Sequence, residues 1–252
     1  MPSAASLYYF SHEAENHSHP PVILIHGAGG NHLSWPPQLR RLPNRRMLAP
    51  DLPAHGKSEG IGHHAVEDYV HDVLEFMSEL GIYSAVLVGH SMGSAAVLSA
   101  AIHFPDRVIA LGLVGSGARL RVSPALLHAA SNPSTFESAV RMINEASFSR
   151  QSARMKELST QRMMGMRPTV LYGDLLACDA FDVTDQLSRI SQSVLIVCGS
   201  DDQMTPVRNS EFLRDHIAGA RLEVVPDAGH MVMLEQPDLI SGLLADFLNS
   251  LN

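Results

Sequence analysis

The pentapeptide Gly89-His90-Ser91-Met92-Gly93 (GHSMG) directly follows the apolar run SAVLV at residues 84–88. The apolar run predicts a short buried strand, and residues 94–104 predict a helix. A serine at such a strand-to-helix junction lies in a sharp, strained turn that exposes its hydroxyl, and flanking glycines avoid clashes with the neighbouring strand and helix. Ser91 is therefore a candidate nucleophile. Its activation requires a base, an orienting carboxylate and an anion trap from elsewhere in the chain.

Five short apolar runs rich in β-branched residues recur along the chain, with helical patterns between them: 22–25, 85–88, 108–114, 194–197 and 222–225. Continuous apolar runs are typical of strands buried on both faces of a largely parallel sheet. The segment 66–82 holds its apolar residues at a 3.6-residue period, and a similar pattern follows Pro237. The sequence predicts an α/β fold, with a mostly parallel central sheet flanked by helices.

A long segment without a strand signal separates the third predicted strand from the fourth. We predict a helical cap insertion over residues 118–190, between core segments 1–117 and 191–252. The insertion carries nine Lys or Arg against seven Asp or Glu, a net charge of +2, whereas the rest of the chain sums to −10. Such charges are typical of solvated helix faces, but they could also attract an anionic substrate or carrier.

Methionine is abundant in this insertion, which holds five of the 12 in the chain. Because methionine is flexible and polarizable, this content fits either a helical core or a pocket for varied apolar groups. The predicted substrate-binding residues are Met142, Met163, Met164, Met204 and Met231.

Composition excludes several classes of protein. Hydrophobic residues make up 45% and charged residues 17% of the 252 residues, as in packed globular proteins. The net charge of −8 leaves no basic stripe for nucleic acid. No apolar run approaches the roughly 18 residues of a membrane span, so no stable membrane association is expected. The N-terminus lacks the pattern of a secretory signal, and a cytoplasmic location is the expectation. The oligomeric state stays open.

The segment HGAGG at residues 26–30 is the candidate anion trap. It follows the first predicted strand and is glycine-rich enough to turn backbone amides toward a ligand. The N–H groups of Ala28 and Met92, the residue after the nucleophile, suit an oxyanion hole. A phosphate-binding loop is the competing interpretation, but the GxGxxG and GxxxxGK[ST] spacings are absent.

The candidate base and acid both follow predicted strands. His230 ends the segment PDAGH after the strand at 222–225, so we expect it at the same edge of the sheet as Ser91. Asp201 and Asp202 follow the strand at 194–197, and either could orient the imidazole. No cysteine or carboxylate spacing supports a metal site, and no cofactor is expected.

With these motifs, the sequence resembles the α/β-hydrolase superfamily, in its small, lid-bearing serine esterase branch. The likeness runs through HGAGG, DLPAHGKS at 51–58, GHSMG, GSDDQMTP at 199–206 and AGH at 228–230. It implies that Asp202, fourth in a G-x-x-D-x-x-x-P pattern, completes a triad with Ser91 and His230. It also implies that the insertion caps the pocket. The short N-terminal region leaves room for at most a hairpin before Val22.

The hypothesis that follows is a serine hydrolase that cleaves small carboxylic esters of short to medium apolar acyl groups through an acyl-enzyme. The end of the insertion, 168–185, is similar to that of enol-lactone hydrolases, and its basic character resembles esterases that act on acyl-carrier methyl esters. Both stay open as substrates. A lyase or cofactor-free perhydrolase using the same triad is an enzymatic rival. A ligand receptor without turnover is the alternative of another class, against which the complete triad counts.

Overall fold

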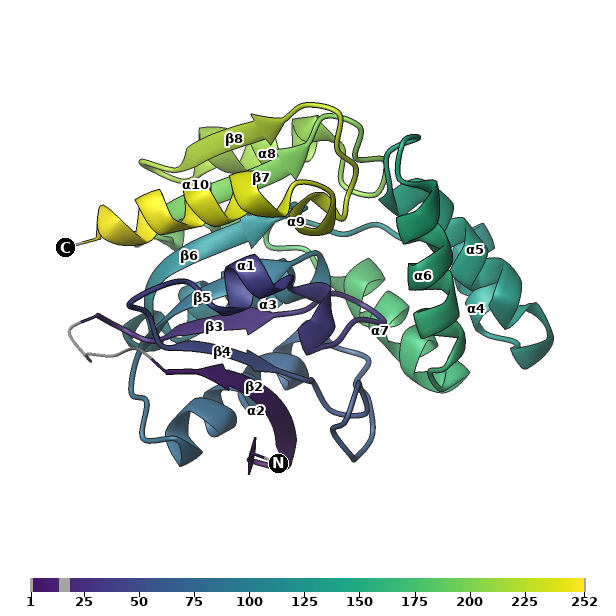
Figure 1. The fold of residues 1–252 in the computed structure, drawn as a ribbon, viewed down its shortest axis with the longest axis horizontal. Helices are drawn as coiled ribbons and strands as arrows, with labels where there is room; N and C mark the ends of the chain where they lie inside the picture. The colour runs from purple at the N-terminus through teal and green to yellow at the C-terminus, as the bar shows by residue number, and fades with distance from the viewer. Residues whose placement is uncertain (1, 14–18, 252) are drawn as a thin grey trace.

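The structure, a computed structural model, describes residues 2–13 and 19–251. Within these residues an eight-stranded sheet has the order β1-β2-β4-β3-β5-β6-β7-β8 (Figure 1). Its strands are β1 (Ser3–Ala4), β2 (Leu7–His12), β3 (Val22–Ile25), β4 (Met47–Pro50), β5 (Ala85–His90), β6 (Val108–Val114), β7 (Ser193–Gly199) and β8 (Arg221–Val225). β2 pairs antiparallel with β1 and β4, and all neighbours from β4 to β8 pair in parallel. The predicted mostly parallel sheet is confirmed.

Three strands have no counterpart among the five predicted ones. β1 and β2 form a hairpin through Ala5 and Ser6, both with positive φ, in agreement with the limit of one hairpin before Val22. β4 (MLAP) holds no β-branched residue and ends in proline, so its composition does not indicate a strand. β8, which was predicted, is the outermost strand and is only partly buried, because it pairs with β7 alone.

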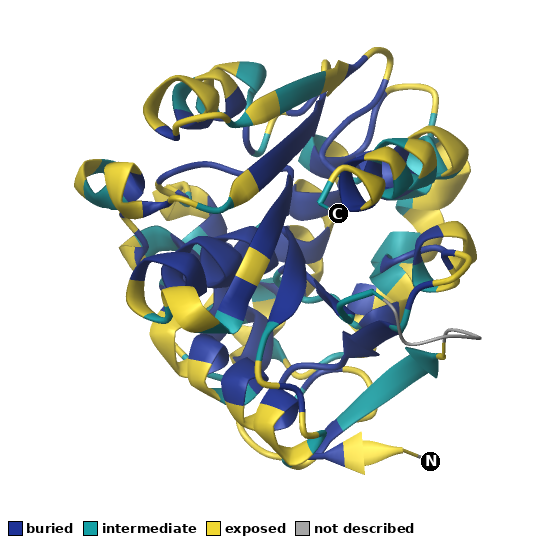
Figure 2. Ribbon diagram, turned by 90° about the vertical axis from the view of Figure 1, so that its left-hand side faces the viewer, coloured by how far each residue is buried: buried dark blue, intermediate teal, exposed yellow. Residues whose placement is uncertain are grey.

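Helices cover both faces of the sheet. The helices α2 (Val66–Glu79), α3 (Met92–His103) and α8 (Val207–His216) pack on one face around the larger core. The other face is covered by α1 (Pro37–Arg40), α9 (Val232–Glu235) and α10 (Pro237–Asn249). Figure 2 shows the strands and the inner faces of the helices buried and the outer faces exposed. Each large apolar side chain buried in this way stabilises the fold by about 1.5–3 kcal/mol.

The insertion is helical and lies beyond one end of the sheet (Figure 1). It comprises α4 (Pro124–Ala130), α5 (Phe136–Ser147), α6 (Ala153–Met164) and α7 (Pro168–Ala180), with a 3₁₀ turn at Pro133–Thr135 and another at Thr184–Arg189. These helices share a small core of their own, to which Phe136, Val140 and Leu171 contribute. The two ends of the insertion instead join the main core, through residues such as Leu120 and Cys178.

The α6 helix is the least buried element of the insertion. Of its 12 residues only Met163 is buried, and α6 packs chiefly against α5. No helix in the described part of the chain combines the length and apolarity needed to cross a membrane.

Candidate active site

Ser91 occupies the junction between β5 and α3. Its backbone has φ 53° and ψ −117°, a conformation that costs a non-glycine residue about 1–3 kcal/mol. The Ser91 amide donates to the carbonyl of Val114 at the end of β6 (2.9 Å), and the Ser91 carbonyl accepts from Ala95 in the first turn of α3 (3.1 Å). The neighbouring strand and the helix thus hold the strained turn, and Ser91 lines a cavity.

Gly93 lets the first turn of α3 pass close to the end of β3. A Cβ atom at this position would lie 2.2 Å from the carbonyl oxygen of Ile25. Backbone atoms cannot withdraw as a flexible side chain can, so any larger residue must push β3 and α3 apart.

The Gly93→Ala variant is therefore expected to lose about 3 kcal/mol of unfolding free energy, because it overpacks a rigid contact. Urea unfolding followed by the fluorescence of Trp35, the single tryptophan, measures the change. Gly242→Ala is the control. Gly242 lies within α10, and a Cβ atom added there would meet open space within 4 Å, so alanine should stabilise the helix by about 0.5–1 kcal/mol. Equal stability of Gly93→Ala and wild type would contradict the close approach.

Asp202 and His230 form a buried pair. The His230 Nδ1 atom lies 2.8 Å from Asp202 Oδ2, and the other carboxylate oxygen accepts the amides of Met204 and Thr205, each at 2.8 Å. Burial alone would raise the pKa of Asp202, but His230 and the hydrogen bonds from Thr205 outweigh it and hold this pKa below its usual value. Asp201, the other candidate, is exposed. The ionised Asp202 is thus the carboxylate placed to orient an imidazole.

The three residues converge at one edge of the sheet. Ser91 follows β5, Asp202 follows β7 and His230 follows β8, and the carboxyl ends of these parallel strands share that edge. Ser91 and His230 line the same cavity. Because Nδ1 of His230 is hydrogen-bonded to Asp202, Nε2 is the ring nitrogen that remains for proton transfer. Among the described residues, no hydrogen bond joins the side chains of Ser91 and His230. Such contacts are often loose without substrate.

His90, to which the sequence assigned no role, packs against the candidate base. Its ring centroid lies 4.6 Å from that of His230, and its Nε2–H donates to the His230 carbonyl (3.1 Å). Burial, and after it the proximity of His230, lowers the pKa of His90 to about 3. His90 is therefore neutral and adds no positive charge that would oppose protonation of His230.

The loop after β3 lies against the nucleophile. A Cβ atom on Gly27 would lie 3.0 Å from the Cβ of Ser91. The Gly30 amide donates to the Gly27 carbonyl (3.0 Å), and Gly29 has φ +66°, as a type II turn requires at its third residue. Ala28, the second residue of this turn, lines the cavity.

The backbone amides of Ala28 and Met92 are the predicted oxyanion donors. Within the described part of the chain, the Ala28 amide donates no hydrogen bond. Met92 is the first residue of α3, so its amide has no partner inside the helix, and its side chain is buried in the core. The oxyanion hole formed by these two groups stays a prediction.

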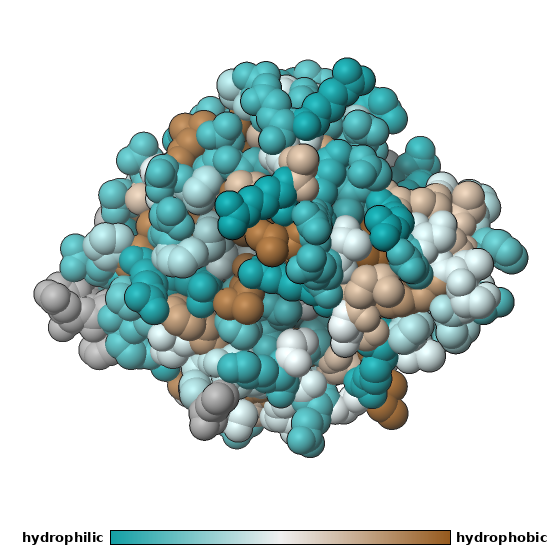
Figure 3. Space-filling model, turned by 45° about the vertical axis from the view of Figure 1, so that its right-hand side comes forward, coloured by the Kyte–Doolittle hydropathy of each residue, from teal (hydrophilic) through white to brown (hydrophobic). Residues whose placement is uncertain are grey.

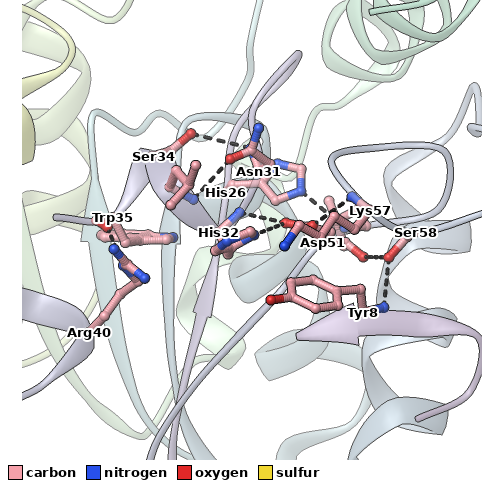
Figure 4. A network of polar contacts seen from close by, with 12 residues as sticks. Tyr8, His26, Asn31, His32, Ser34, Trp35, Arg40, Asp51, Lys57 and Ser58 are labelled. Carbon is pink, nitrogen blue, oxygen red and sulfur yellow. Dashed lines mark hydrogen bonds and ion pairs between the residues drawn. The ribbon is translucent and has the colours of Figure 1, made fainter. Parts of the chain in front are cut away.

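A polar network supports this loop from the neighbouring segment 51–58 (Figure 4). Asp51 accepts hydrogen bonds from the amide of His32 (2.6 Å), the ring of His32 (2.8 Å) and the amide of Lys57 (2.8 Å). His26 accepts from the Leu52 amide through Nε2 and donates to the Gly27 carbonyl through Nδ1. Burial lowers the pKa of His26 to about 4, so the ring is neutral and can accept a hydrogen bond through one nitrogen and donate through the other.

A second buried network reaches the loop from the insertion. Asp174 on α7 is fully buried, and its Oδ2 accepts from the Gly29 amide (2.9 Å) and faces His55 Nε2 (2.8 Å). Its Oδ1 accepts from the hydroxyl of Tyr69 (2.6 Å). Because His55 Nδ1 faces the Pro53 carbonyl (2.9 Å), both ring nitrogens meet oxygens, which fits a protonated imidazolium.

The electrostatics of His55 agree with this protonation. Burial acts to lower the pKa of His55, but the charge and hydrogen bond of Asp174 prevail and raise it. In the sequence, Asp174 is one of the charged residues of the insertion, which are typical of solvated helix faces but could also attract an anionic substrate or carrier. No local pattern reveals this pairing, because its partners lie more than a hundred residues away.

Glu235 ties the insertion to the loop that carries His230. Its carboxylate accepts from the amide and hydroxyl of Ser149, at 2.9 and 2.7 Å, and also from the hydroxyl of Ser152 and the amide of Gly229. The Met231 amide donates to the carbonyl of Ser147 (3.0 Å). The insertion thus holds the loops of both the candidate base and the candidate oxyanion hole.

The cavity has a volume of about 250 Å³ and lies between the sheet edge and the insertion. Its walls are mainly apolar, with Phe148, Leu158 and Leu175 among the contributions of the insertion. Figure 3 shows the face on which the insertion comes forward, where small apolar patches lie among polar side chains.

Three of the five predicted methionines line this cavity: Met163, Met204 and Met231. Met142 and Met164 lie outside the lining, with 38% and 41% of their surfaces exposed. Met142 lies on the face of α5 opposite its buried residues, and Met164 is rotated by one helical step from the buried Met163. Methionine content does not tell which face of a helix meets a cavity.

In the described part of the chain, both cysteines are unreactive and no cluster of metal-ligating side chains is present. Cys178 and Cys198 are buried free thiols whose pKa values burial raises, so both stay protonated. Over residues 2–13 and 19–251, no three His, Cys, Asp or Glu side chains are arranged to hold a metal ion.

Comparisons with known proteins give consistent relatives. The model of the Alpha/beta hydrolase family matches residues 22–242. A 2-hydroxy-6-oxo-6-phenylhexa-2,4-dienoate hydrolase of Burkholderia cepacia is 30% identical, over 90% of this chain and 87% of that protein. A 3-oxoadipate enol-lactonase of Acinetobacter baylyi is 26% identical, over 92% of this chain and 90% of its own. The solved structure of a thermophilic esterase has a TM-score of 0.82 and 29% identity, covering 98% of this chain and 99% of the other.

Proposed function

Because this chain belongs to the alpha/beta hydrolase family, we propose that it is a serine hydrolase that cleaves carboxylic esters through an acyl-enzyme on Ser91. The observation that carries the proposal is the convergence of Ser91, Asp202 and His230 at the carboxyl ends of parallel strands, beside one cavity. Relatives that are hydrolases by name support the same reaction class.

The proposed reaction has two steps. His230, oriented by Asp202, takes the Ser91 proton through Nε2 as the hydroxyl oxygen attacks the ester carbonyl. The amides of Ala28 and Met92 bind the oxyanion of the tetrahedral intermediate, and each donor accounts for about 10²–10³ in rate. The alcohol leaves with the proton held by His230. Water, deprotonated by the same imidazole, then attacks the acyl-enzyme and releases the acid and free Ser91.

The cavity supports an acyl group of limited size. About 250 Å³ with apolar walls accommodates short to medium apolar chains. The insertion supplies one wall, so we infer that residues 118–190 act as a cap over the substrate.

Labelling and turnover together test the proposal. A fluorophosphonate should add to the protein once, and mass spectrometry should locate the adduct on Ser91. Initial rates on p-nitrophenyl esters with two to about twelve acyl carbons should be highest at or below about eight carbons, given the cavity volume. Absence of both labelling and turnover would favour a ligand receptor instead.

A substrate that carries a carboxylate is a second candidate, and Arg162 favours it. Apart from histidine, Arg162 is the one charged side chain among the described cavity-lining residues, and it makes no ion pair with them. A guanidinium beside an apolar cavity suits a carboxylate at the far end of the acyl group. The Acinetobacter relative is a 3-oxoadipate enol-lactonase, so a lactone acid belongs to this candidate class.

The Arg162→Gln variant is expected to raise KM for the p-nitrophenyl half-ester of a dicarboxylic acid about fivefold and to leave a neutral ester unchanged. The expected effect is about 1 kcal/mol, because Arg162 is exposed and solvent weakens a charge-assisted hydrogen bond. Arg154→Gln is the matched control, since Arg154 lies on the same helix outside the cavity lining. Equal effects of Arg162→Gln on both esters, or of both variants on the half-ester, would refute this selectivity.

A further inference from the structure

Asp174 is a buried carboxylate that the proposed reaction does not use. It projects from α7 of the insertion and meets three separate parts of the core: the loop after β3, the segment 51–58 and helix α2. Asp174 has no role in the proposed catalytic triad, and the names of the relatives given above indicate none for it. A buried carboxylate destabilises the fold unless hydrogen bonds or an opposite charge compensate its lost hydration. Asp174 has three such partners within hydrogen-bond distance.

We propose, resting on the esterase function above, that Asp174 is a positioning residue for the oxyanion hole. Its carboxylate fixes the Gly29 turn, and through that turn it sets the place of the Ala28 amide.

One hydrogen bond and one peptide unit separate Asp174 from the predicted oxyanion donor Ala28. The Gly29 amide donates to Asp174 Oδ2 at 2.9 Å, and Ala28, which lines the cavity, is the adjoining residue in the same turn. Gly27, on the other side of Ala28, already lies against Ser91. A shift of Gly29 therefore moves Ala28 relative to a nucleophile that is itself held by β6 and α3.

Packing prevents Gly29 from moving independently of the insertion. A Cβ atom on Gly29 would lie 2.9 Å from Met163 Cε and 3.2 Å from Leu171 Cδ1, and both side chains belong to the insertion. The hydrogen bond from Asp174 comes from the same unit. The insertion thus fixes this turn both by contact and by a directed hydrogen bond.

The charge of His55 fixes Asp174 in turn. His55 is held through Nδ1 by the Pro53 carbonyl and faces Asp174 Oδ2 through Nε2 at 2.8 Å, with both side chains fully buried. Tyr69 donates to the other carboxylate oxygen at 2.6 Å. With its orientation set from two sides, Asp174 presents one oxygen to the Gly29 amide in a single geometry.

Steady-state kinetics of Asp174→Ala on p-nitrophenyl butyrate test the proposal. We expect kcat to fall about 10–100-fold with KM within about threefold of wild type, because displaced oxyanion donors weaken the transition state rather than substrate binding. Affinity for a trifluoromethyl ketone, whose adduct with Ser91 carries an oxyanion, should fall by a similar factor. Asp174→Asn should recover most of kcat, since its amide oxygen can still accept from Gly29.

Asp179→Asn is the matched control. Asp179 lies on the same helix and accepts the Val122 amide within the insertion, away from the cavity, so kcat should stay within about twofold of wild type. Circular dichroism at the assay temperature establishes that each variant is folded.

If Asp174→Ala is unfolded because His55 is left unpaired, two double variants take its place in the kinetic test. Both carry His55→Leu, and position 174 is asparagine in one and leucine in the other. Both therefore lack the buried ion pair, a loss that proteins often tolerate, and only the asparagine form keeps an acceptor for the Gly29 amide. The Asn form should be the faster by tenfold or more.

Three results would overturn the inference: a folded Asp174→Ala protein with wild-type kcat, a rise in KM at constant kcat, or an Asn form as slow as the form without an acceptor. A wild-type protein that neither hydrolyses esters nor labels on Ser91 would instead refute the proposed function.

Discussion

Replacement of Ser91 by alanine is expected to lower kcat/KM on p-nitrophenyl butyrate by at least about 10⁴-fold, because the covalent acyl-enzyme cannot form. The residual rate would come from the oxyanion donors and from substrate binding alone. Alanine should also relieve little of the backbone strain, since φ 53° is unfavourable for any residue with a Cβ. Stopped assays with purified protein, long enough to measure the residual rate, determine the loss.

Ser99→Ala is the control for this experiment. Ser99 lies on α3 in the core, outside the cavity lining, and its loss should leave the rate within about threefold of wild type. A Ser91→Ala protein that kept most of the wild-type activity would exclude the acyl-enzyme mechanism.

The second large effect is expected for Asp202→Asn, with a loss of about 10³–10⁴ in kcat. Asp202 Oδ1 accepts two backbone amides, from Met204 and Thr205, so an asparagine must place its oxygen there and its NH₂ group toward His230 Nδ1. Two donors would then face each other, and the imidazole would move its proton to Nε2. In that tautomer His230 cannot accept the proton of Ser91.

Asp201→Asn separates this explanation from a general effect of charge. Asp201 is the adjacent residue, is exposed, and accepts a hydrogen bond from the hydroxyl of Ser200. Its replacement by asparagine should therefore leave kcat within about twofold of wild type. Equal losses from the two variants, or a greater loss from Asp201→Asn, would reassign the orienting carboxylate.

Much of this arrangement could be predicted because parallel strands bring their carboxyl ends to one edge. Ser91, Asp202 and His230 each follow an apolar run that forms a strand, and this placement is visible without any tertiary information. The choice between Asp201 and Asp202 was less accessible from the residues. It depends on which carboxylate is buried against the amides of its own turn.

The remaining features could not be predicted because their causes are not local. Asp174 meets Gly29 and His55 across separations of 145 and 119 residues, and in the sequence it is one acidic residue in a charged helical segment. The strand β4 forms without any β-branched residue, because its place between β2 and β3 in the sheet outweighs its weak local preference. For Met142 and Met164, helical periodicity groups residues by face but does not tell which face meets the cavity.

The sparse burial of α6 has a consequence for how selectivity evolves. This helix supplies Met155, Leu158, Arg162 and Met163 to the cavity wall, yet of these only Met163 is buried. Substitutions at its other positions can therefore change the shape of the cavity at little cost to the stability of the fold. A saturation library confined to this one helix would retune substrate preference without redesigning the scaffold.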